Sequence, residues 1–112
     1  MEASQLQMKL IINNDLGMGK GKIAAQVGHT VSAITLHCFT KDPHQWKQYV
    51  AQGSAKIVLK ASGETIQALA ARKHAFVTHD AGRTQIEAGS LTCVGFLPTT
   101  ALDPLLNTLK LL

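Results

Sequence analysis

The sequence predicts an α/β fold with three α/β/α layers and a small mixed, mostly parallel four-stranded sheet in the middle. Three observations lead to this fold class. Short apolar runs typical of buried strands alternate with longer segments of helical periodicity. Glycines, prolines and helix-capping residues lie at the boundaries between those segments. A parallel crossover needs a connection about as long as a helix, and most of the predicted strands are separated by one.

The N-terminal part is predicted to form a strand followed by a long helix. Residues 6–12 contain an apolar run typical of a largely buried strand. After the glycine-rich segment 15–22, apolar side chains recur at intervals of three or four residues: Ile23, Val27, Val31, Ile34 and Cys38. That spacing places them on one stripe of a helix, which is expected to face the core.

The middle of the chain is predicted to contain a short helix, a strand and a third helix. Asp42 and Pro43 supply an N-cap and a first helical residue, and Gly53 suits the end of that helix. Residues 56–61 form a second apolar run of the buried kind. Ser62 then caps the third helix, which ends in a basic pair that complements the helix dipole.

The C-terminal part is predicted to add two strands and a closing helix. The third strand covers residues 75–78, the fourth covers 91–97, and the helix covers 99–108. A loop over residues 80–89, with no helix, joins the two strands, so we expect them to pair antiparallel. The glycine-bearing loops at 17–22 and 80–89 both follow strand ends, where ligands gather in sheets of this kind.

Length and composition limit the class of protein. A chain of 112 residues suits one domain, which we assign to residues 7–112 after a loosely ordered segment at 1–6. No apolar run approaches the roughly 20 residues of a membrane span, and no secretory signal is recognisable. An intracellular protein is therefore expected, with the cytoplasm favoured and a mitochondrial location left open. Cys38 and Cys93 are expected to be buried, reduced thiols.

The glycine-rich segment 15–22 is the strongest functional signal within the first half of the chain. It carries three glycines and two lysines between a strand and a helix. Glycine permits a tight turn and a close approach, and the unpaired N–H groups of a helix start attract anions. The net charge of +4 agrees with an anionic partner, but a charged fraction of 16% favours a local site over a broad basic face.

Two common nucleotide-binding motifs do not fit this segment. A phosphate-binding P-loop would need glycine where Leu16 stands and a hydroxyl where Ile23 stands. The dinucleotide pattern matches by letter from Gly19 to Ala24, but the second strand ends in Lys60 and Ala61 rather than in the acid that binds ribose. The segment therefore indicates another kind of anion site.

Three segments together resemble the type 2 peptidyl-tRNA hydrolases of archaea and eukaryotes. The first is MGKGKIAAQ at residues 18–26, with His29 just beyond; the second is DAGRTQ at 80–85; the third is GSLTCVG at 89–95. Their order and spacing are similar to the family from about residue 8 to the closing LKLL. Any one segment alone is modest evidence, whereas the combination is highly specific.

The resemblance implies hydrolysis of the ester between a peptide and the 3'-terminal ribose of tRNA, which recycles stalled peptidyl-tRNA. It also implies a small mixed sheet between helical layers, in agreement with the fold predicted above. The catalytic residues that it implies are Lys22, Asp80, Thr84, Thr92, Gln26 and His29. Lys20 and Arg83, together with Gly19 and Gly21, are the candidates for binding tRNA, since phosphate contacts position a nucleic acid without reading its sequence.

The chemistry of ester hydrolysis suits these residue types. Negative charge builds on the carbonyl oxygen, so a fixed ammonium such as Lys22 stabilises the transition state. Asp80 is expected to orient that lysine or a water rather than to act as a base, because a carboxylate near an ammonium stays ionised. Thr84 is expected either to position the attacking water or to donate to the oxyanion.

Two features depart from the family pattern. Asn13 stands where the family usually has an arginine, and the link 72–76 is several residues shorter than usual. These departures keep open a non-catalytic tRNA-binding or protein-interaction module with the same fold. No metal or other cofactor is expected, because the histidines and cysteines show no ligand spacing. The expected partner is peptidyl-tRNA, with neither DNA nor a membrane, and the chain suits a monomer or a homodimer.

Overall fold

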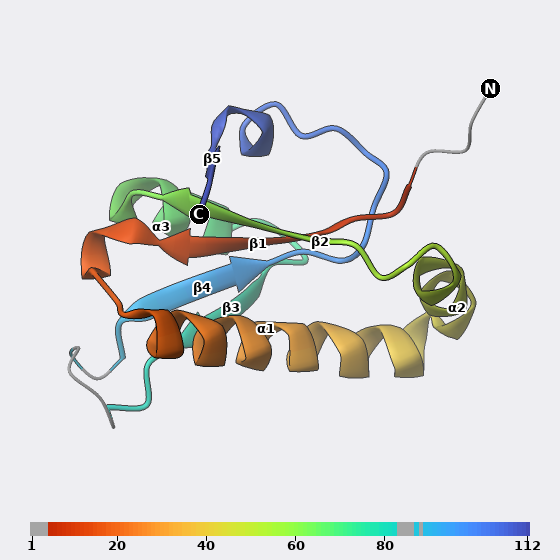
Figure 1. Cartoon of the computed structure of the whole chain (residues 1–112), viewed down its shortest axis with the longest axis horizontal. Helices are drawn as coiled ribbons and strands as arrows, with labels where there is room; N and C mark the ends of the chain where they lie inside the picture. Colours follow the sequence, from red (N-terminus) through yellow and green to blue (C-terminus); the bar gives the residue numbers. More distant parts are fainter. Residues whose placement is uncertain (1–4, 83–86, 88) are drawn as a thin grey trace.

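A five-stranded mixed sheet forms the centre of the molecule (Figure 1). The computed structural model describes residues 5–82, 87 and 89–112. The strands lie in the order β3-β4-β1-β2-β5. Their bounds are Met8–Asn13 for β1, Lys56–Ala61 for β2, Phe76–His79 for β3, Leu91–Gly95 for β4 and Lys110–Leu111 for β5. The predicted α/β class is confirmed, with one strand more than expected.

The pairing of the strands differs from the expected, mostly parallel arrangement. Only β1 and β2 pair in parallel, whereas β1 with β4, β3 with β4, and β2 with β5 are antiparallel. The antiparallel pairing of β3 and β4 agrees with the prediction from the sequence. The strand β5 adds a further antiparallel pair at the edge, which the sequence did not reveal because it is two residues long.

The described residues form three α-helices, and the boundaries of these helices follow the capping residues. They are α1 (Lys20–Lys41), α2 (Pro43–Ala51) and α3 (Gly63–Ala70), with short 3-10 turns η1 (Asn14–Leu16) and η2 (Leu106–Thr108). The Asp42 carboxylate accepts from the Gln45 N–H at the start of α2, and the Ser62 hydroxyl accepts from the Thr65 N–H at the start of α3. None of the helices in the described part of the chain is long and apolar enough to cross a membrane.

The predicted helix at residues 99–108 does not form. Thr99 pairs antiparallel with Gln7 through two backbone hydrogen bonds of 3.0 and 3.1 Å. Pro104 lacks an N–H and disfavours helical backbone in the residue before it, so the segment turns into η2 and then into β5 instead. The carboxylate of Asp103 accepts from the backbone N–H groups of Leu105 and Leu106 and so holds this turn.

Two apolar clusters fill the spaces on the two faces of the sheet. One lies against α1 and α2 and includes Leu10, Ile12, Ile34 and Tyr49; the other lies against α3 and η2 and includes Ile11, Leu59, Ile66 and Leu106. Cys38 and Cys93 belong to the first cluster and are free thiols, as expected. Burial raises the pKa of Cys93 to about 11, which keeps this thiol protonated and unreactive.

Candidate active site

A cavity of about 560 Å³ lies at the end of the sheet where β3 ends and α1 begins. Residues from both elements line it, including four predicted catalytic residues: Lys22, Gln26, His29 and Asp80. These residues lie up to 58 positions apart in the chain. The fold therefore joins the first and second sequence motifs in one site.

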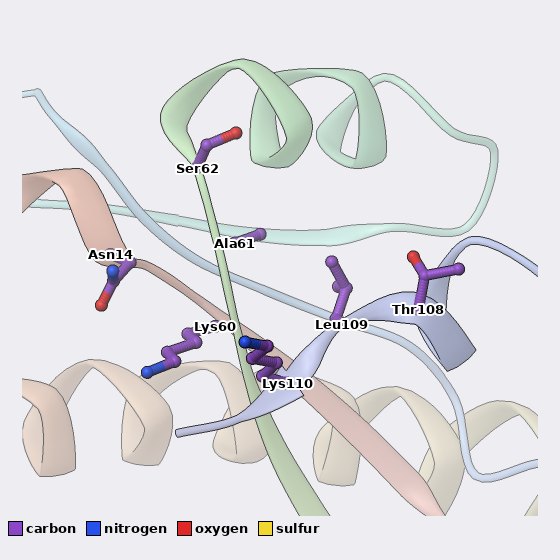
Figure 2. Close-up of a pocket in the computed structure, with 7 residues that line it drawn as sticks. All are labelled: Asn14, Lys60, Ala61, Ser62, Thr108, Leu109 and Lys110. Carbon is purple, nitrogen blue, oxygen red and sulfur yellow. The ribbon is translucent and has the colours of Figure 1, made fainter.

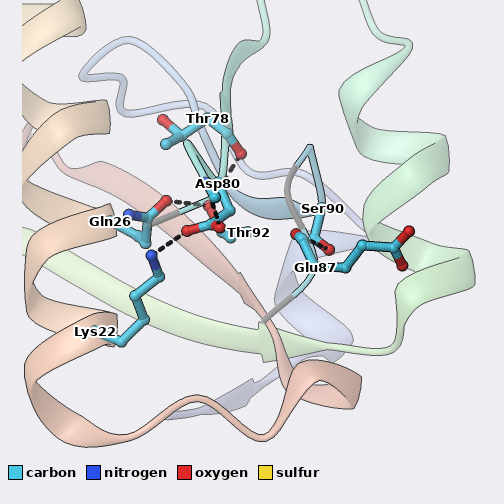
Figure 3. A network of polar contacts seen from close by, with 8 residues as sticks. Lys22, Gln26, Thr78, Asp80, Glu87, Ser90 and Thr92 are labelled. Atoms are coloured by element: carbon cyan, nitrogen blue, oxygen red, sulfur yellow. Dashed lines mark hydrogen bonds and ion pairs between the residues drawn. The ribbon is translucent and has the colours of Figure 1, made fainter. Parts of the chain in front are cut away.

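The ammonium of Lys22 pairs with the carboxylate of Asp80 at this cavity (Figure 3). The Asp80 side chain has no exposed surface, and that of Lys22 keeps 16%. The second carboxylate oxygen of Asp80 accepts from the Gly82 N–H at 2.8 Å. The backbone of Asp80 is held as well, since its N–H donates to Ser90 and its carbonyl accepts from Gly89. Asp80 thus holds the lysine from a rigid support.

Thr92 and Gln26 form a second contact between α1 and the sheet. The Thr92 hydroxyl lies 2.6 Å from Oε1 of Gln26 and 3.0 Å from the backbone carbonyl of Thr78. Both side chains are buried, with Gln26 4% exposed and Thr92 not at all. A hydroxyl has one proton, so it donates to one of these acceptors at a time. The bond to the sheet holds the amide of Gln26 in place at the cavity wall.

A β-bulge explains how Thr92 reaches α1. Thr78 pairs with Cys93 and His79 pairs with Leu91, so Thr92 is the extra residue between the two pairs. Leu91 packs in the cluster against α3, whereas Cys93 packs in the cluster against α1. Bulges of this kind change the direction of a side chain and occur often beside active sites. Strict alternation along the strand would not have predicted this direction.

Two further threonines, the buried Thr30 and the partly buried Thr78, extend this network, and the sequence reasoning missed both. The Thr30 hydroxyl donates to the carbonyl of Gln26 at 3.0 Å and lies 2.7 Å from the Thr78 hydroxyl. The available signal was the spacing of four that links the buried residues of α1: Gln26, Thr30, Ile34 and Cys38. Of the predicted apolar stripe, Ile34 and Cys38 are buried, while the other three members are partly buried and pack against the same core.

His29 lies on the cavity wall together with His79, which was not predicted. Both histidines are exposed. The position of His79 directly before Asp80 in the sequence was the only available signal, and one histidine next to an aspartate is weak evidence. The described residues contain no group of three or more histidines, cysteines or acids that could hold a metal ion.

The glycine-rich segment forms the start of α1, as predicted. Gly19 is the N-cap, Lys20 is exposed in the first turn, and Gly21 lines the cavity. A Cβ added at Gly19 or Gly21 would meet no described atom within 4 Å, and neither backbone has a positive φ. Packing in the fold therefore does not require glycine at either position. The first turn also contains no acidic residue, so its N–H groups keep their attraction for an anion.

The remaining predictions fall elsewhere. Arg83 and Thr84 lie outside the described residues. Asn13, which departs from the family pattern, donates to the carbonyl of Leu91 at 2.9 Å and accepts from the Asp15 N–H, so it ties the end of β1 to the start of β4. The short link 72–76 closes as a tight turn with His74 at a φ of +69°.

Comparison with known proteins places the chain in a family. The family model described as "Peptidyl-tRNA hydrolase PTH2" matches residues 6–112. A peptidyl-tRNA hydrolase of Sulfolobus acidocaldarius is 38% identical over 120 residues, covering 96% of this chain and all of the relative. One from Saccharolobus islandicus strain L.S.2.15 is 34% identical, covering 96% of this chain and 99% of the relative. The chain therefore belongs to the PTH2 family of peptidyl-tRNA hydrolases.

Proposed function

We propose that this protein hydrolyses the ester bond between a peptide and the 3'-terminal ribose of tRNA. Water adds to the ester carbonyl, the bond from the carbonyl carbon to the ribose oxygen breaks, and that oxygen takes up a proton. The products are the free peptide and a tRNA with a free terminal hydroxyl. Family membership supports this reaction, and the observation that carries it is the Lys22 and Asp80 pair on the wall of the cavity.

Lys22 supplies charge where the reaction needs it. As water adds, the carbonyl oxygen becomes an oxyanion, and a fixed ammonium stabilises that oxyanion more than the neutral ester. The N–H groups of the first turn of α1 add partial positive charge at the same end of the helix. Part of the Lys22 side chain remains exposed, so the ammonium can meet a substrate in the cavity.

Asp80 acts by positioning rather than by taking a proton. One of its carboxylate oxygens contacts Lys22 and the other accepts from Gly82. The contact with the ammonium makes holding that lysine the role that suits this carboxylate. The role that follows is to hold the flexible lysine chain in one orientation, which lowers the entropy cost of reaching the transition state.

Gln26 presents an amide to the cavity, and Thr92 positions that amide. With Oε1 facing the Thr92 hydroxyl, the Nε2 group has no hydrogen-bond partner among the described residues and is left to donate to the substrate carbonyl. His29 lines the same wall and is proposed to contact the substrate. Thr84 is proposed to position the attacking water or to donate to the oxyanion, and Lys20 and Arg83 to bind tRNA phosphates.

The direct test is release of peptide from peptidyl-tRNA by the wild type and by Lys22→Ala. We expect Lys22→Ala to lower kcat by roughly 10²- to 10³-fold, the usual loss for one oxyanion-stabilising donor, while tRNA binding is retained. Lys41→Ala is the matched control, because Lys41 is exposed at the opposite end of α1. No peptide release by the wild type, where a verified relative is active, would instead support a non-catalytic tRNA-binding module.

The substrate also indicates where the protein works. Peptidyl-tRNA arises during translation, so we propose that the protein acts in the cytoplasm on this RNA and not on DNA. We also propose that residues 7–112 form a single domain. Cell fractionation with the ribosome-free supernatant as the expected fraction tests the location, and gel filtration with light scattering decides between a monomer and a homodimer.

A further inference from the structure

A second, shallow pocket of about 250 Å³ lies at the opposite edge of the sheet, between β2 and β5 (Figure 2). Two lysines line it, Lys60 from β2 and Lys110 from β5, together with Asn14 of η1 and Ser62 before α3. Figure 2 shows the two lysines side by side where β2 and β5 pair. The sequence analysis gave no role to either lysine.

The two lysines are cross-strand neighbours on the adjacent strands β2 and β5. Lys60 and Lys110 are direct partners in the antiparallel register of β2 and β5. Like charges in this arrangement repel and destabilise the pairing of the strands. Neither ammonium takes part in an ion pair within the described part of the chain, where the two ion pairs belong to Lys22 and Arg72. The Asp15 carboxylate, next to Asn14 in the sequence, accepts from the Gly63 N–H. An anion from outside the protein would balance the charge of the two ammonium groups.

The Lys60 side chain lies on the same face of the sheet as the candidate active site. Lys60 pairs in register with Ile12, which belongs to the cluster under α1, so the Lys60 side chain lies on the α1 face. Both sites also lie at the end of the sheet where β1 and β2 finish and α1 begins (Figure 1). Between β3, which ends at Asp80, and β5 there are four strand spacings of about 4.8 Å, or roughly 19 Å.

We propose that Lys60 and Lys110 bind a backbone phosphate of the same tRNA whose ester end lies beside Lys22. This inference rests on the proposed function. A tRNA carries phosphates all along its backbone, so a molecule with its 3' end in the cavity spans the distance to the second pocket. One phosphate between the two ammonium groups removes their repulsion and releases counterions, which adds affinity without sequence preference.

The test compares Lys60→Gln/Lys110→Gln with Lys41→Gln/Lys47→Gln on two substrates. Both double variants remove two positive charges, but Lys41 and Lys47 are exposed on α1 and α2, away from both pockets. The substrates are full peptidyl-tRNA and a peptidyl ester of the CCA trinucleotide, which lacks the body of the tRNA. Binding of deacylated tRNA at several salt concentrations is measured in parallel.

We expect Lys60→Gln/Lys110→Gln to raise KM for peptidyl-tRNA by roughly 3- to 10-fold, with little change in kcat. The slope of log affinity for deacylated tRNA against log salt should fall by about 1 to 2. KM for the short ester should not change, and the Lys41→Gln/Lys47→Gln control should retain wild-type values for both substrates.

Equal KM values for peptidyl-tRNA in the two double variants would overturn the inference while leaving the hydrolase activity intact. An equal rise in KM for both substrates would also overturn it, because the lysines would then act at the ester end. No peptide release by the wild type would instead refute the proposed function. The salt dependence of tRNA binding would then still test the two lysines. Lys110→Gln alone, at an exposed edge position, serves if the double variant does not fold.

Discussion

The ammonium of Lys22 contacts the carboxylate of Asp80, although 58 residues separate them in the chain. Lys22 belongs to the first turn of α1, and Asp80 follows the last residue of β3. The contact therefore forms only when α1 packs over β3 and β4. It converts a flexible, solvated lysine into a fixed positive charge on a cavity wall, which is what stabilisation of an oxyanion requires.

The positioning role of Asp80 predicts non-additive losses. Asp80→Asn should lower kcat by roughly 10- to 100-fold, because the lysine is no longer held. The double variant Lys22→Ala/Asp80→Asn should be about as slow as Lys22→Ala alone, since Asp80 then has no lysine to position. Single-turnover peptide release measures all three. Losses that multiply in the double variant would show that Asp80 acts independently of Lys22.

The bulge at Thr92 predicts that its hydroxyl, and not its shape, supports Gln26. Thr92→Val keeps the volume but removes the donor, which leaves the buried Gln26 oxygen and the partly buried Thr78 carbonyl without this hydrogen bond. We expect a loss of about 1–3 kcal/mol in the free energy of unfolding and a fall in kcat. Thr92→Ser should restore both, as measured by urea denaturation and peptide release. Equal kcat values for the valine and serine variants would show that the Thr92 hydroxyl has no part in catalysis.

The glycine at position 21 predicts a trade of stability against activity. Gly21→Ala should stabilise the protein by up to about 1 kcal/mol, because a Cβ there meets no described atom and glycine is unfavourable in helices. The same methyl group enters the cavity, so KM for peptidyl-tRNA should rise. Gly28→Ala, elsewhere on α1 and also free of contacts, is the control that should stabilise without loss of activity. Equal activity of the two variants would contradict a close approach of substrate to Gly21.

The C-terminal turn predicts a dependence of stability on pH. Burial raises the pKa of Asp103, but bonds from the Leu106 and Leu105 N–H groups and from Arg72 outweigh it and leave the pKa below its ordinary value. A lowered pKa means that the ionised carboxylate stabilises the fold above the unfolded-state pKa, near 4, and that this stabilisation disappears as the pH falls through the folded-state pKa.

Asp103→Asn should therefore unfold at lower urea than the wild type at pH 7, and the two midpoints should converge once the pH falls below the folded-state pKa of Asp103. The asparagine oxygen can still accept from the backbone, so the loss reflects mainly the ion pair with Arg72 and should stay near or below about 1 kcal/mol, because that pair is partly exposed to solvent. A difference of the same size at both pH values would assign the effect to packing instead of charge.

Local sequence signals were sufficient wherever an element is defined by its own residues. The β2 strand at residues 56–61, the Asp42 and Ser62 caps and the glycine-rich start of α1 were predicted correctly, because apolar runs and capping oxygens act within a few residues. The C-terminal segment was predicted wrongly, because β5 gains its hydrogen bonds from β2, about 50 residues away.

The sequence by itself determined the α/β class, the family and the motifs that contain Lys22, Gln26 and Asp80. Only the tertiary structure decided that Lys22 contacts Asp80 and that a bulge turns Thr92 toward Gln26. It also decided that Lys60 of β2 pairs with Lys110 of the edge strand β5. The physical reason is that spacing within a helix or strand sets which face a residue occupies, whereas strand order and register set which faces meet.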